Sequence, residues 1–430
     1  MRITVRKSPS VIVRPSSEPP PTTSVTEKLS SLDMPFLKLT VTSFLVFEHP
    51  IHDATETIKR ALSHALVYYY PFAGRIIATT DGEFHVRCGG ECVAFVAATA
   101  DCTLKDAKLL DHSNGEMSMT MTLLEELAAY YPTEGCRPTD PLLLTQVTEF
   151  TCGGFVLGVT WHHGIADGIG MAQFLQAVGE FSRGFPSPSV LPVRWDASLP
   201  SLPPSILQHV VSPELLRLAC LGITIPSSLI NRIKSSFRDR SNGQMTCTTF
   251  DAIAAVLWQC RTRAIVSDPN SMTLLSISVN VRKHVGAKDG YYGNCVFTQQ
   301  VIANISAVVN ADIVDLIKMI KHAKDDLLLR LDNNKEGVCE MIRAMGQQQR
   351  DQLRYNTLCL SSWRNIGFEE ADFGGGTPAR VMSYMSPLKA LPVCITSLPC
   401  KGAGPGNVLS VCVKEEHADA FVAQLARLNT

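Results

Sequence analysis

The spacing of apolar residues between positions 142 and 181 predicts two strands followed by a helix. Large apolar side chains alternate with smaller ones over 155–161, which is the period of a β-strand. Residues 142–150 form the other strand of a hairpin around the turn 151–154. From residue 169 onward apolar side chains recur every three or four positions, which predicts an amphipathic helix. Residues 162–168 are therefore a turn from a strand end to a helix start.

The rest of the chain mixes strand and helix patterns without strict alternation. Such a mixture favours an α/β or α+β class, with the elements arranged in two lobes. The segments with a strand pattern are 1–14, 274–281 and 408–413, and those with a helical pattern are 54–70, 253–258, 313–329 and 418–428.

The length of the chain predicts more than one domain. At 430 residues it is too long for a single compact core. Seven prolines between positions 186 and 213 indicate an extended segment that crosses between domains. We therefore expect an N-terminal lobe over 1–185, a crossover over 186–225 and a C-terminal lobe over 226–430.

Charge and composition exclude several classes of function. A net charge of -1 gives no electrostatic basis for binding nucleic acid or an anionic membrane surface. No apolar run approaches the ~18 residues of a membrane span, and the first residues lack the apolar core of a signal peptide. The fourteen cysteines contain no C-x-x-C pair, so no metal site is expected and a reducing compartment is favoured. We expect a soluble, cytoplasmic protein.

The turn at 162–168 carries the candidate chemistry. It contains His163 and Asp167 in the pattern HxxxD, followed by Gly168. Because the unperturbed pKa of histidine is about 6.5, an imidazole suits proton removal from an alcohol or amine near neutral pH. The acid four residues later orients the ring or braces the loop. Two other interpretations remain open: Asp167 is only a helix N-cap, and His162 is only a buried neighbour.

A second HxxxD serves as an internal control. His322 and Asp326 have the same spacing, but they lie within the helical pattern of 313–329. There they belong to the polar face between the apolar positions, which is typical of a solvated helix surface. We therefore expect no chemistry at His322.

Several short strings occur in a fixed order along almost the whole chain, and together they resemble the BAHD family of plant acyl-CoA-dependent acyltransferases. The strings are Leu29-Ser30-Ser31-Leu32-Asp33, Tyr70-Pro71-Phe72-Ala73-Gly74-Arg75, His163-x-x-x-Asp167-Gly168, Thr248-Thr249-Phe250 ahead of Trp258, Asn280-Val281-Arg282, Tyr292-Gly293-Asn294-Cys295, Ser361-Ser362-Trp363 and Asp372-Phe373-Gly374.

The resemblance implies a fold and a mechanism. The fold has two similar lobes, each a mixed β-sheet flanked by helices, with a central channel as in chloramphenicol acetyltransferase. Acyl-CoA enters this channel as a co-substrate from one face, and a small alcohol or amine enters from the other; no tightly bound cofactor is implied, and we expect a monomer. His163 is the general base, and Asp167 supports it by holding Arg282. The acyl group passes directly to the acceptor, since no serine or cysteine lies in a nucleophile elbow.

The resemblance also assigns residues that bind the substrates. Ser361 is the candidate donor to the oxyanion, although a hydroxyl bound to its own backbone is an equal alternative. Trp363 forms a pocket wall. Thr248 and Thr249 suit a CoA phosphate at a helix start, and simple capping explains them as well. The string Tyr292, Gly293 and Asn294 is expected near the cofactor channel.

One string departs from the family pattern. The family usually has Asp-Phe-Gly-Trp-Gly, whereas this chain has Asp372, Phe373, Gly374, Gly375 and Gly376. Because the loop, including Asp372 and Gly374, is regarded as structural, loss of the tryptophan affects local packing before it affects chemistry.

Two alternatives to this function are carried forward. Condensation domains of peptide synthetases share His-His-x-x-x-Asp-Gly, but this chain has no carrier domain and does have the Asp-Phe-Gly element. A catalytically silent relative that acts as a partner protein is the other alternative, and the intact His163, Asp167 and Arg282 argue against it. The habit of the family favours an aromatic acyl group, benzoyl or hydroxycinnamoyl, and the acceptor stays open.

Overall fold

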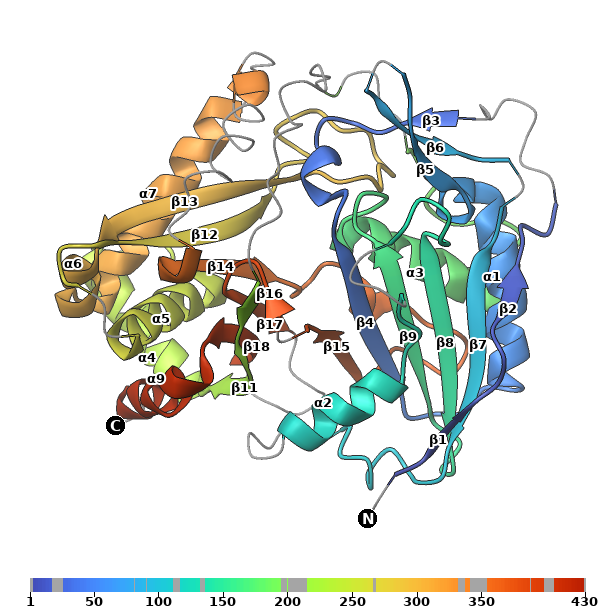
Figure 1. The fold of residues 1–430 in the computed structure, drawn as a ribbon. Helices are drawn as coiled ribbons and strands as arrows, with labels where there is room; N and C mark the ends of the chain where they lie inside the picture. The colour runs from blue at the N-terminus through green and yellow to red at the C-terminus, as the bar shows by residue number, and fades with distance from the viewer. Residues whose placement is uncertain are drawn as a thin grey trace.

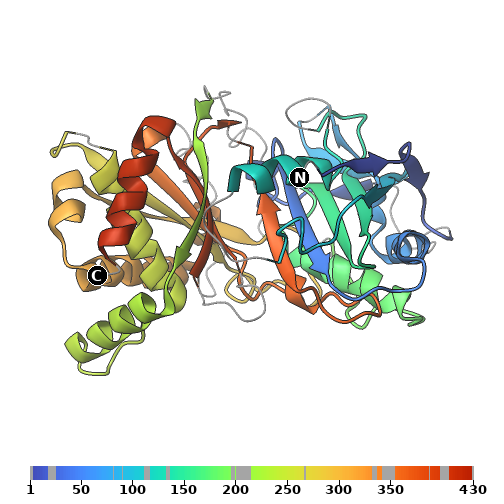
Figure 2. The same cartoon turned by 90° about the horizontal axis from the view of Figure 1, so that it is seen from below.

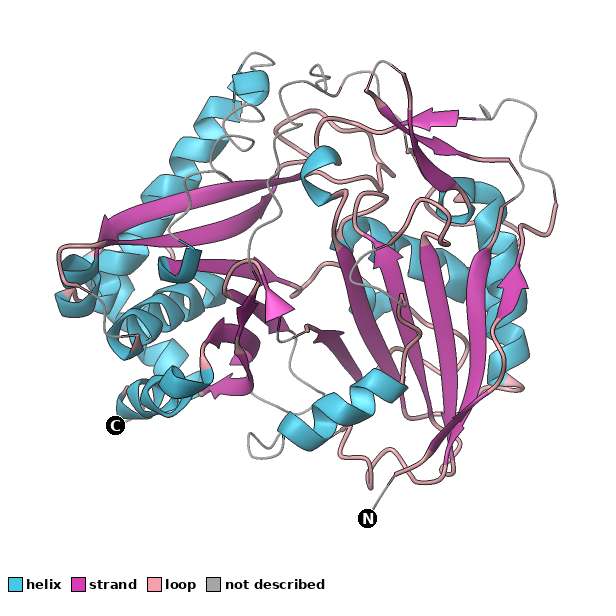
Figure 3. Ribbon diagram, viewed as in Figure 1, coloured by secondary structure: helices cyan, strands magenta, loops and turns pink. Residues whose placement is uncertain are grey.

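The computed structural model contains two lobes that lie side by side, each with its own sheet (Figures 1 and 2). It describes residues 3–17, 26–80, 82–89, 91–110, 117–131, 136–194, 199, 215–265, 268–331, 337–340, 354–386, 388–397 and 406–428. Helices and strands are interleaved in both lobes (Figure 3), as the predicted mixed class requires.

The first lobe is built on a seven-stranded sheet in the order β1-β7-β8-β9-β4-β15, with β2 also paired to β7. The predicted hairpin is confirmed as β8 and β9, and all eight residues of β9 are buried. The strands are β1 (Val5–Lys7), β2 (Val11–Val13), β4 (Thr40–Phe47), β7 (Val93–Ala100), β8 (Leu143–Phe150), β9 (Phe155–His162) and β15 (Arg380–Tyr384).

Helices cover both faces of this sheet. On one face α1 (Ala54–Tyr68) and α3 (Gly168–Ser182) lie side by side, and α2 (Met117–Glu126) crosses the other (Figure 1). Both α1 and α3 were predicted from their apolar spacing. Helix α1 ends at Tyr68, just before the short η2 (Tyr70–Ala73) that contains Pro71. A small sheet of β3 (Thr26–Lys28), β5 (Arg75–Ala78) and β6 (Phe84–Arg87) lies beyond them.

The second lobe is built on a six-stranded sheet in the order β11-β18-β17-β14-β12-β13. The strands are β11 (Ala219–Ile225), β12 (Met272–Asn280), β13 (Val296–Asn304), β14 (Thr357–Ser362), β17 (Val393–Ser397) and β18 (Gly406–Val413). The helices are α4 (Ser227–Arg240), α5 (Thr249–Ala264), α6 (Ile305–Asn310), α7 (Ile313–Leu331) and α9 (Glu415–Arg427), and the remaining short elements are η1 (Met34–Phe36), η4 (Arg354–Asn356), η5 (Phe368–Glu370), β10 (Leu216–Arg217) and β16 (Leu388–Lys389).

The two sheets exchange segments across the boundaries expected from sequence. Strand β15 lies in the half assigned to the second lobe, yet it pairs antiparallel with β4 of the first sheet. Strand β11 lies in the expected crossover 186–225, yet it is an edge of the second sheet. The single strand pattern of 1–14 is also divided, into β1 and β2. The boundaries at 1–185 and 226–430 therefore do not coincide with the two sheets. As boundaries of folding units they stay a prediction.

Candidate active site

His163 lies directly after β9, at the end of the strand that the sequence predicted. The backbone N–H of His163 donates to the carbonyl oxygen of Leu39 (2.9 Å), which continues the pairing of β9 with β4. Its imidazole stacks on the ring of Phe36, with centroids 4.4 Å apart and planes inclined by 12°. The residue is partly exposed while its neighbours are buried. The ring is therefore held in a defined orientation.

Asn294 determines which imidazole nitrogen carries the proton. The side-chain N–H₂ of Asn294 donates to the carbonyl oxygen of His163 (2.8 Å) and to Asp33 Oδ1 (2.8 Å). Its Oδ1 must therefore accept, and it lies 3.0 Å from Nδ1 of His163. The proton of the neutral ring is consequently on Nδ1, which leaves Nε2 with a free lone pair.

The surroundings of His163 keep its ring neutral. Burial lowers the pKa of His163 below the usual value for histidine, and the charges of Asp167 and Asp33 oppose this shift in part. A histidine with a lowered pKa is unprotonated near neutral pH and can accept a proton.

His162 is a support for the same turn. Its Nδ1 accepts from the backbone N–H of Gly164 (3.1 Å), and the side chain is 4% exposed. Burial lowers the pKa of His162 to about 4. The ring is therefore neutral and its acceptor nitrogen is occupied, as expected for a satisfied neighbour of the motif.

Asp167 connects three elements through its two carboxylate oxygens. Oδ1 accepts from the backbone N–H of Gly170 (3.0 Å) and from the guanidinium of Arg282 (2.8 Å). Oδ2 accepts from the backbone N–H of Cys295 (3.0 Å). Asp167 is thus the N-cap of α3 and also the partner of Arg282 that the resemblance implies, so the two interpretations of this residue are compatible.

The segment after β12 reaches the motif because the first turn of α3 has a glycine, Gly170, at the point of contact. A Cβ on Gly170 would lie 1.8 Å from the carbonyl oxygen of Tyr292, so the backbone of this segment lies directly on the first turn of α3. Arg282 ties the segment down from the other side by donating to the carbonyl oxygen of Gly293 (2.8 Å). This contact places Asn294 beside His163.

The string Tyr292, Gly293 and Asn294, which was expected near the cofactor channel, includes two buried side chains. Tyr292 is 1% exposed and packs in the core of the first lobe, with its ring 5.0 Å from that of Tyr69 and 5.7 Å from that of Phe72. Asn294 is 0% exposed and bound to His163 and Asp33. The role of this string toward CoA stays a prediction.

The end of β14 meets the motif strand from the second lobe. Trp363 is 9% exposed, its ring stacks on Phe368 with centroids 5.4 Å apart, and it lies 6.3 Å from the ring of Trp161 in β9. Ser361 is the second-to-last residue of β14 and is partly exposed. Both residues therefore lie at the junction of the lobes.

Thr248 and Thr249 begin α5, as the capping signal predicted. Thr248 and Asp251 form a reciprocal capping box, with hydrogen bonds of 3.0 and 3.1 Å. The hydroxyl of Thr249 accepts from Nζ of Lys234 (2.8 Å), and Nζ of Lys324 donates to Asp251 (2.6 Å). The threonine hydroxyls have protein partners, and two lysines, one of them paired with Asp251, lie at the helix start.

The loop that departs from the family pattern is packed against the first lobe. Oδ1 of Asp372 accepts from the backbone N–H groups of Gly374 (2.8 Å) and Gly376 (2.9 Å), which closes a turn in which Gly374 has φ +111°. A Cβ on Gly375 would lie 3.0 Å from Cγ2 of Ile51 and 3.1 Å from the carbonyl oxygen of His49. The segment around Ile51 therefore occupies the space beside Gly375.

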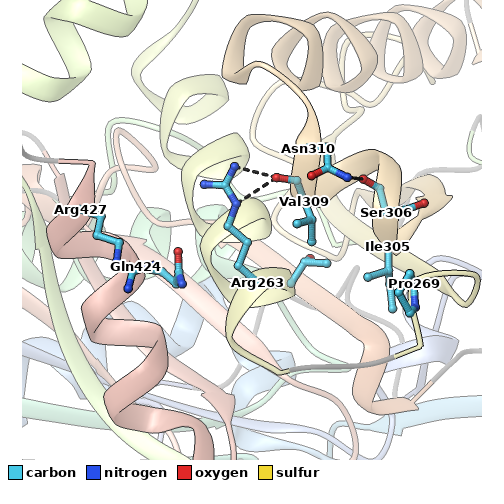
Figure 4. Close-up of a pocket in the computed structure, with 9 residues that line it drawn as sticks. Arg263, Pro269, Ile305, Ser306, Val309, Asn310, Gln424 and Arg427 are labelled. Carbon is cyan, nitrogen blue, oxygen red and sulfur yellow. Dashed lines mark hydrogen bonds between the residues drawn. The ribbon is translucent and has the colours of Figure 1, made fainter.

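A hollow of about 560 Å³ in the second lobe lies apart from this site (Figure 4). Two arginines, Arg263 and Arg427, line it. The guanidinium of Arg263 is engaged, because both Nε and Nη2 donate to the carbonyl oxygen of Val309, at 3.0 and 2.7 Å. The lining of the hollow includes none of the residues grouped around His163.

Two structural findings bear on metals and membranes. Within the described ranges, no group of three or more histidine, cysteine, aspartate or glutamate side chains is placed to hold a metal ion. In those same ranges, each helix is too short or too polar to cross a bilayer.

Sequence reasoning missed two residues near the motif. Asp33 was noted only as the end of a string, and Arg194 was part of a proline-rich segment. They form an ion pair of 3.0 Å with side chains 0% and 4% exposed, and Asp33 also binds Asn294. The charge of Asp33 at the end of an otherwise uncharged string, residues 29–33, was the only local signal.

Comparison with known proteins identifies the class. A family model described as "Transferase family" matches residues 1–427 of the chain. With a neutral histidine at the junction of two mixed lobes, this match defines an acyl-CoA-dependent acyltransferase of plant metabolism. The chain belongs to this family, the BAHD acyltransferases that its motif strings resemble.

Curated relatives of plant origin agree with this membership. The chain is 43% identical to Acyl transferase 15 of Oryza sativa subsp. japonica, over 100% of this chain and 99% of the relative. It is 33% identical to a myricetin 3-O-glucosyl 1,2-rhamnoside 6'-O-caffeoyltransferase of Crocosmia x crocosmiiflora, over 99% of each chain. It is also 32% identical to the 3'-N-debenzoyl-2'-deoxytaxol N-benzoyltransferase of Taxus canadensis, over 97% of this chain and 94% of the relative.

Solved structures confirm the predicted two-lobed fold. Vinorine synthase superposes with a TM-score of 0.78 at 20% identity, covering 99% of this chain and 98% of that one. TRI101 of F. graminearum, complexed with coenzyme A and T-2 mycotoxin, gives a TM-score of 0.66 at 15% identity over 93% and 97%. The first condensation domain of the calcium-dependent antibiotic synthetase has the same fold, with a TM-score of 0.63 at 12% identity over 95% and 96%.

Proposed function

We propose that this acyltransferase moves an acyl group from CoA directly to a small alcohol or amine, with His163 as the general base. The observation that carries the proposal is the hydrogen bond of 3.0 Å between Nδ1 of His163 and Oδ1 of Asn294. It supports a neutral ring with its lone pair on Nε2, which is the form that a general base requires.

The proposed reaction is a single transfer. Nε2 of His163 takes the proton of the acceptor as its oxygen or nitrogen attacks the thioester carbonyl carbon. The tetrahedral intermediate then collapses, the carbon–sulfur bond breaks, and His163 returns the proton to the CoA sulfur. General-base assistance of this kind typically contributes ~10²–10⁴-fold to the rate.

The cysteine that contacts the motif, Cys295, is a poor candidate for an acyl-enzyme nucleophile. Cys295 is bound through its backbone to Asp167 and is 0% exposed. Burial raises the pKa of its thiol to about 12, so almost none of it is the thiolate that a nucleophilic step needs. Direct transfer requires no such group.

We assign supporting roles to four residues. Asp167 and Arg282 hold the motif turn against the segment that carries Asn294. Ser361 is the candidate donor to the oxyanion, and its place at the end of β14 supports this role. Trp363 packs against Trp161 of the motif strand, and we assign it to a wall between the lobes.

We assign the phosphates of CoA to the start of α5, where Thr248 and Thr249 lie. Three lysines contribute positive charge around this helix start: Lys234, Lys321 and Lys324. The N-terminus of a helix attracts anions, and neighbouring lysines strengthen that attraction.

The substrates are proposed by analogy with relatives. One relative is named a caffeoyltransferase and another an N-benzoyltransferase, so an aromatic acyl group is our proposal for the donor, with an alcohol or an amine as acceptor. We further propose a monomer in the cytoplasm.

A thiol-release assay tests the function. Purified protein is incubated with benzoyl-CoA, caffeoyl-CoA and acetyl-CoA, each with pooled alcohols and then pooled amines, and free CoA is measured with a thiol reagent. His163→Ala protein serves as the blank. We expect acceptor-dependent release with an aromatic donor that is absent from the blank. Release that is equal in the two proteins would contradict the role of His163 as the base. No release with any pair would contradict the proposed activity and favour a silent partner protein.

A further inference from the structure

Asp33 is a buried carboxylate with an unusual number of hydrogen bonds. Its Oδ2 accepts from the backbone N–H of Ser30 (2.7 Å), the hydroxyl of Ser30 (2.8 Å) and the guanidinium of Arg194 (3.0 Å). Its Oδ1 accepts from both the backbone N–H and the side-chain N–H₂ of Asn294, at 3.1 and 2.8 Å. The carboxylate is therefore held in place from three directions.

Asp33 controls the orientation of the Asn294 amide. An asparagine side chain can be reversed, and the reversed amide would present N–H₂ to Nδ1 of His163. Oδ1 of Asp33 can only accept while ionised, so it selects the orientation in which N–H₂ of Asn294 faces it. Oδ1 of Asn294 then faces His163, as found. Asp33 thus acts on the imidazole through the one amide group that lies between them.

Arg194 balances the charge of Asp33 and touches the motif turn. Its Nη2 lies 3.0 Å from Asp33 Oδ2 and 3.4 Å from the carbonyl oxygen of Gly164. Nε and Nη1 of Arg194 have no hydrogen-bond partner within the part of the chain that the structure describes. Asp33 is thus its ion-pair partner, and loss of the carboxylate leaves a buried positive charge beside the turn.

We propose that Asp33 and Arg194 are positioning residues for His163. Asp33 acts through Asn294 to keep the proton of His163 on Nδ1, and Arg194 holds the carboxylate and the backbone of the turn. This inference rests on the proposed role of His163 as the base.

The charged and titratable groups that face His163 are Asp33, Asp167, His162, Arg194 through Asp33, and Arg282 through Asp167. Asp33→Asn removes the negative charge that raises the pKa of His163. The substitution also leaves the positive charge of Arg194 without its carboxylate partner. Both changes disfavour the protonated ring, so the pKa of His163 falls further.

The test compares Asp33→Asn with a matched control in the same lobe. Asp140 is also buried, and its carboxylate accepts from the backbone N–H of Arg137 (2.9 Å) and from its guanidinium (3.2 Å). Asp140→Asn therefore removes a similar charge and similar hydrogen bonds away from His163. Both variants are compared with the wild-type protein by steady-state kinetics and by ¹⁵N NMR of labelled histidine without substrates, with His163→Gln used to assign the signal.

In Asp33→Asn we expect kcat to fall about ten-fold or more with the KM for acyl-CoA unchanged. We also expect the acid limb of the pH profile to move to lower pH, and the His163 ¹⁵N shifts to report loss of the pure Nδ1–H tautomer. Asp140→Asn should change none of these. An unchanged tautomer and acid limb in Asp33→Asn would overturn the proposal, even if the variant were less stable.

Asp33→Glu is the second variant if Asp33→Asn does not fold. It keeps the charge opposite Arg194 but moves the carboxylate by one methylene, so we expect a lower kcat, an unchanged KM and the same NMR change. Wild-type kcat and tautomer would overturn the positioning role. The proposed base is tested separately: a His163→Ala protein with normal activity contradicts the base, whatever Asp33 does to the tautomer.

Discussion

His162 and His163 are adjacent in the chain but have different surroundings. The Nδ1 atom of His162 accepts from Gly164, whereas Nδ1 of His163 faces the amide oxygen of Asn294. The first ring therefore carries its proton on Nε2 and the second on Nδ1. The hydrogen-bond partner, rather than the residue type, determines which of the two can act as a base.

We predict that His163→Ala lowers kcat by ~10²-fold or more with the fold intact, because the general base is removed. The measurement is CoA release under saturating substrates, with circular dichroism to confirm folding. His322→Ala is the control, since His322 has the same HxxxD spacing on the exposed surface of α7. Equal losses in the two variants would refute the assignment of the base.

We predict that the protein loses stability as the pH falls from about 6.5 to about 4, in part because of His162. Its pKa is about 4 in the folded protein and 6.5 as the ordinary value. Over that range the unfolded chain binds the proton and the folded protein does not, so the free energy of unfolding falls as pH falls.

Thermal melting across this pH range measures the effect. His162→Gln, which cannot be protonated, should have a shallower dependence of Tm on pH than the wild type. The same slope in both proteins would show that His162 is not responsible.

Asp167 joins elements that are distant in sequence. It caps α3, accepts from the residue before β13 and pairs with Arg282 after β12. Its side chain is 3% exposed and that of Arg282 14%. One carboxylate therefore fixes the helix that follows the motif against the segment that carries Asn294.

We predict that Asp167→Ala reduces both stability and activity. Removing one partner of a buried ion pair commonly costs about 3–5 kcal/mol, and Arg282 would be left without its carboxylate. Urea unfolding measures the change, and Asp326→Ala on the exposed face of α7 is the control. A variant that unfolds like the wild type but has no activity would place Asp167 in the chemistry instead.

We predict that Gly170→Ala lowers activity by displacing Asn294. The new Cβ would lie 1.8 Å from the carbonyl oxygen of Tyr292, so the backbone of that segment must move away from α3. A shift of about 1 Å at a catalytic group can cost ~10²-fold in rate. Gly89→Ala is the control, because its Cβ would meet the carboxylate of Glu91 at an ordinary 3.6 Å. Full activity in Gly170→Ala would show that the contact does not position Asn294.

The two lobes are connected by more than the chain that crosses between them. Strand β15 completes the first sheet from the second half of the sequence, and Trp363 packs against Phe368 and the motif strand. The segment from 363 to 384 therefore belongs to both lobes. The junction that holds His163 therefore requires residues from both halves of the chain.

We predict that acyl transfer proceeds without a covalent enzyme intermediate. Intact mass spectrometry after incubation with acyl-CoA alone should show the unmodified mass, and initial rates should show a ternary complex. The reason is that a base acting on the acceptor needs no enzyme nucleophile. A stoichiometric acyl adduct that acceptor removes, together with ping-pong kinetics, would contradict direct transfer and implicate a cysteine or serine.

Local order in the sequence determined the elements around the motif. The alternation over 155–161 predicted β9, the spacing after residue 169 predicted α3, and the capping signal at Thr248 predicted the start of α5. These features depend on residues within one or two turns of each other, so one segment of sequence contains the information. The HxxxD motif could be located for the same reason.

Folding in three dimensions decided the partners of His163 and the composition of the sheets. Asn294 is 131 residues from His163 and 261 from Asp33, and β15 pairs with a strand more than three hundred residues earlier. Periodicity describes which face of an element is buried but not which distant element covers it. The hydrogen bond between Asn294 and His163 was therefore not predicted, and Arg194 was missed, because only packing of the lobes brings their polar atoms to the motif.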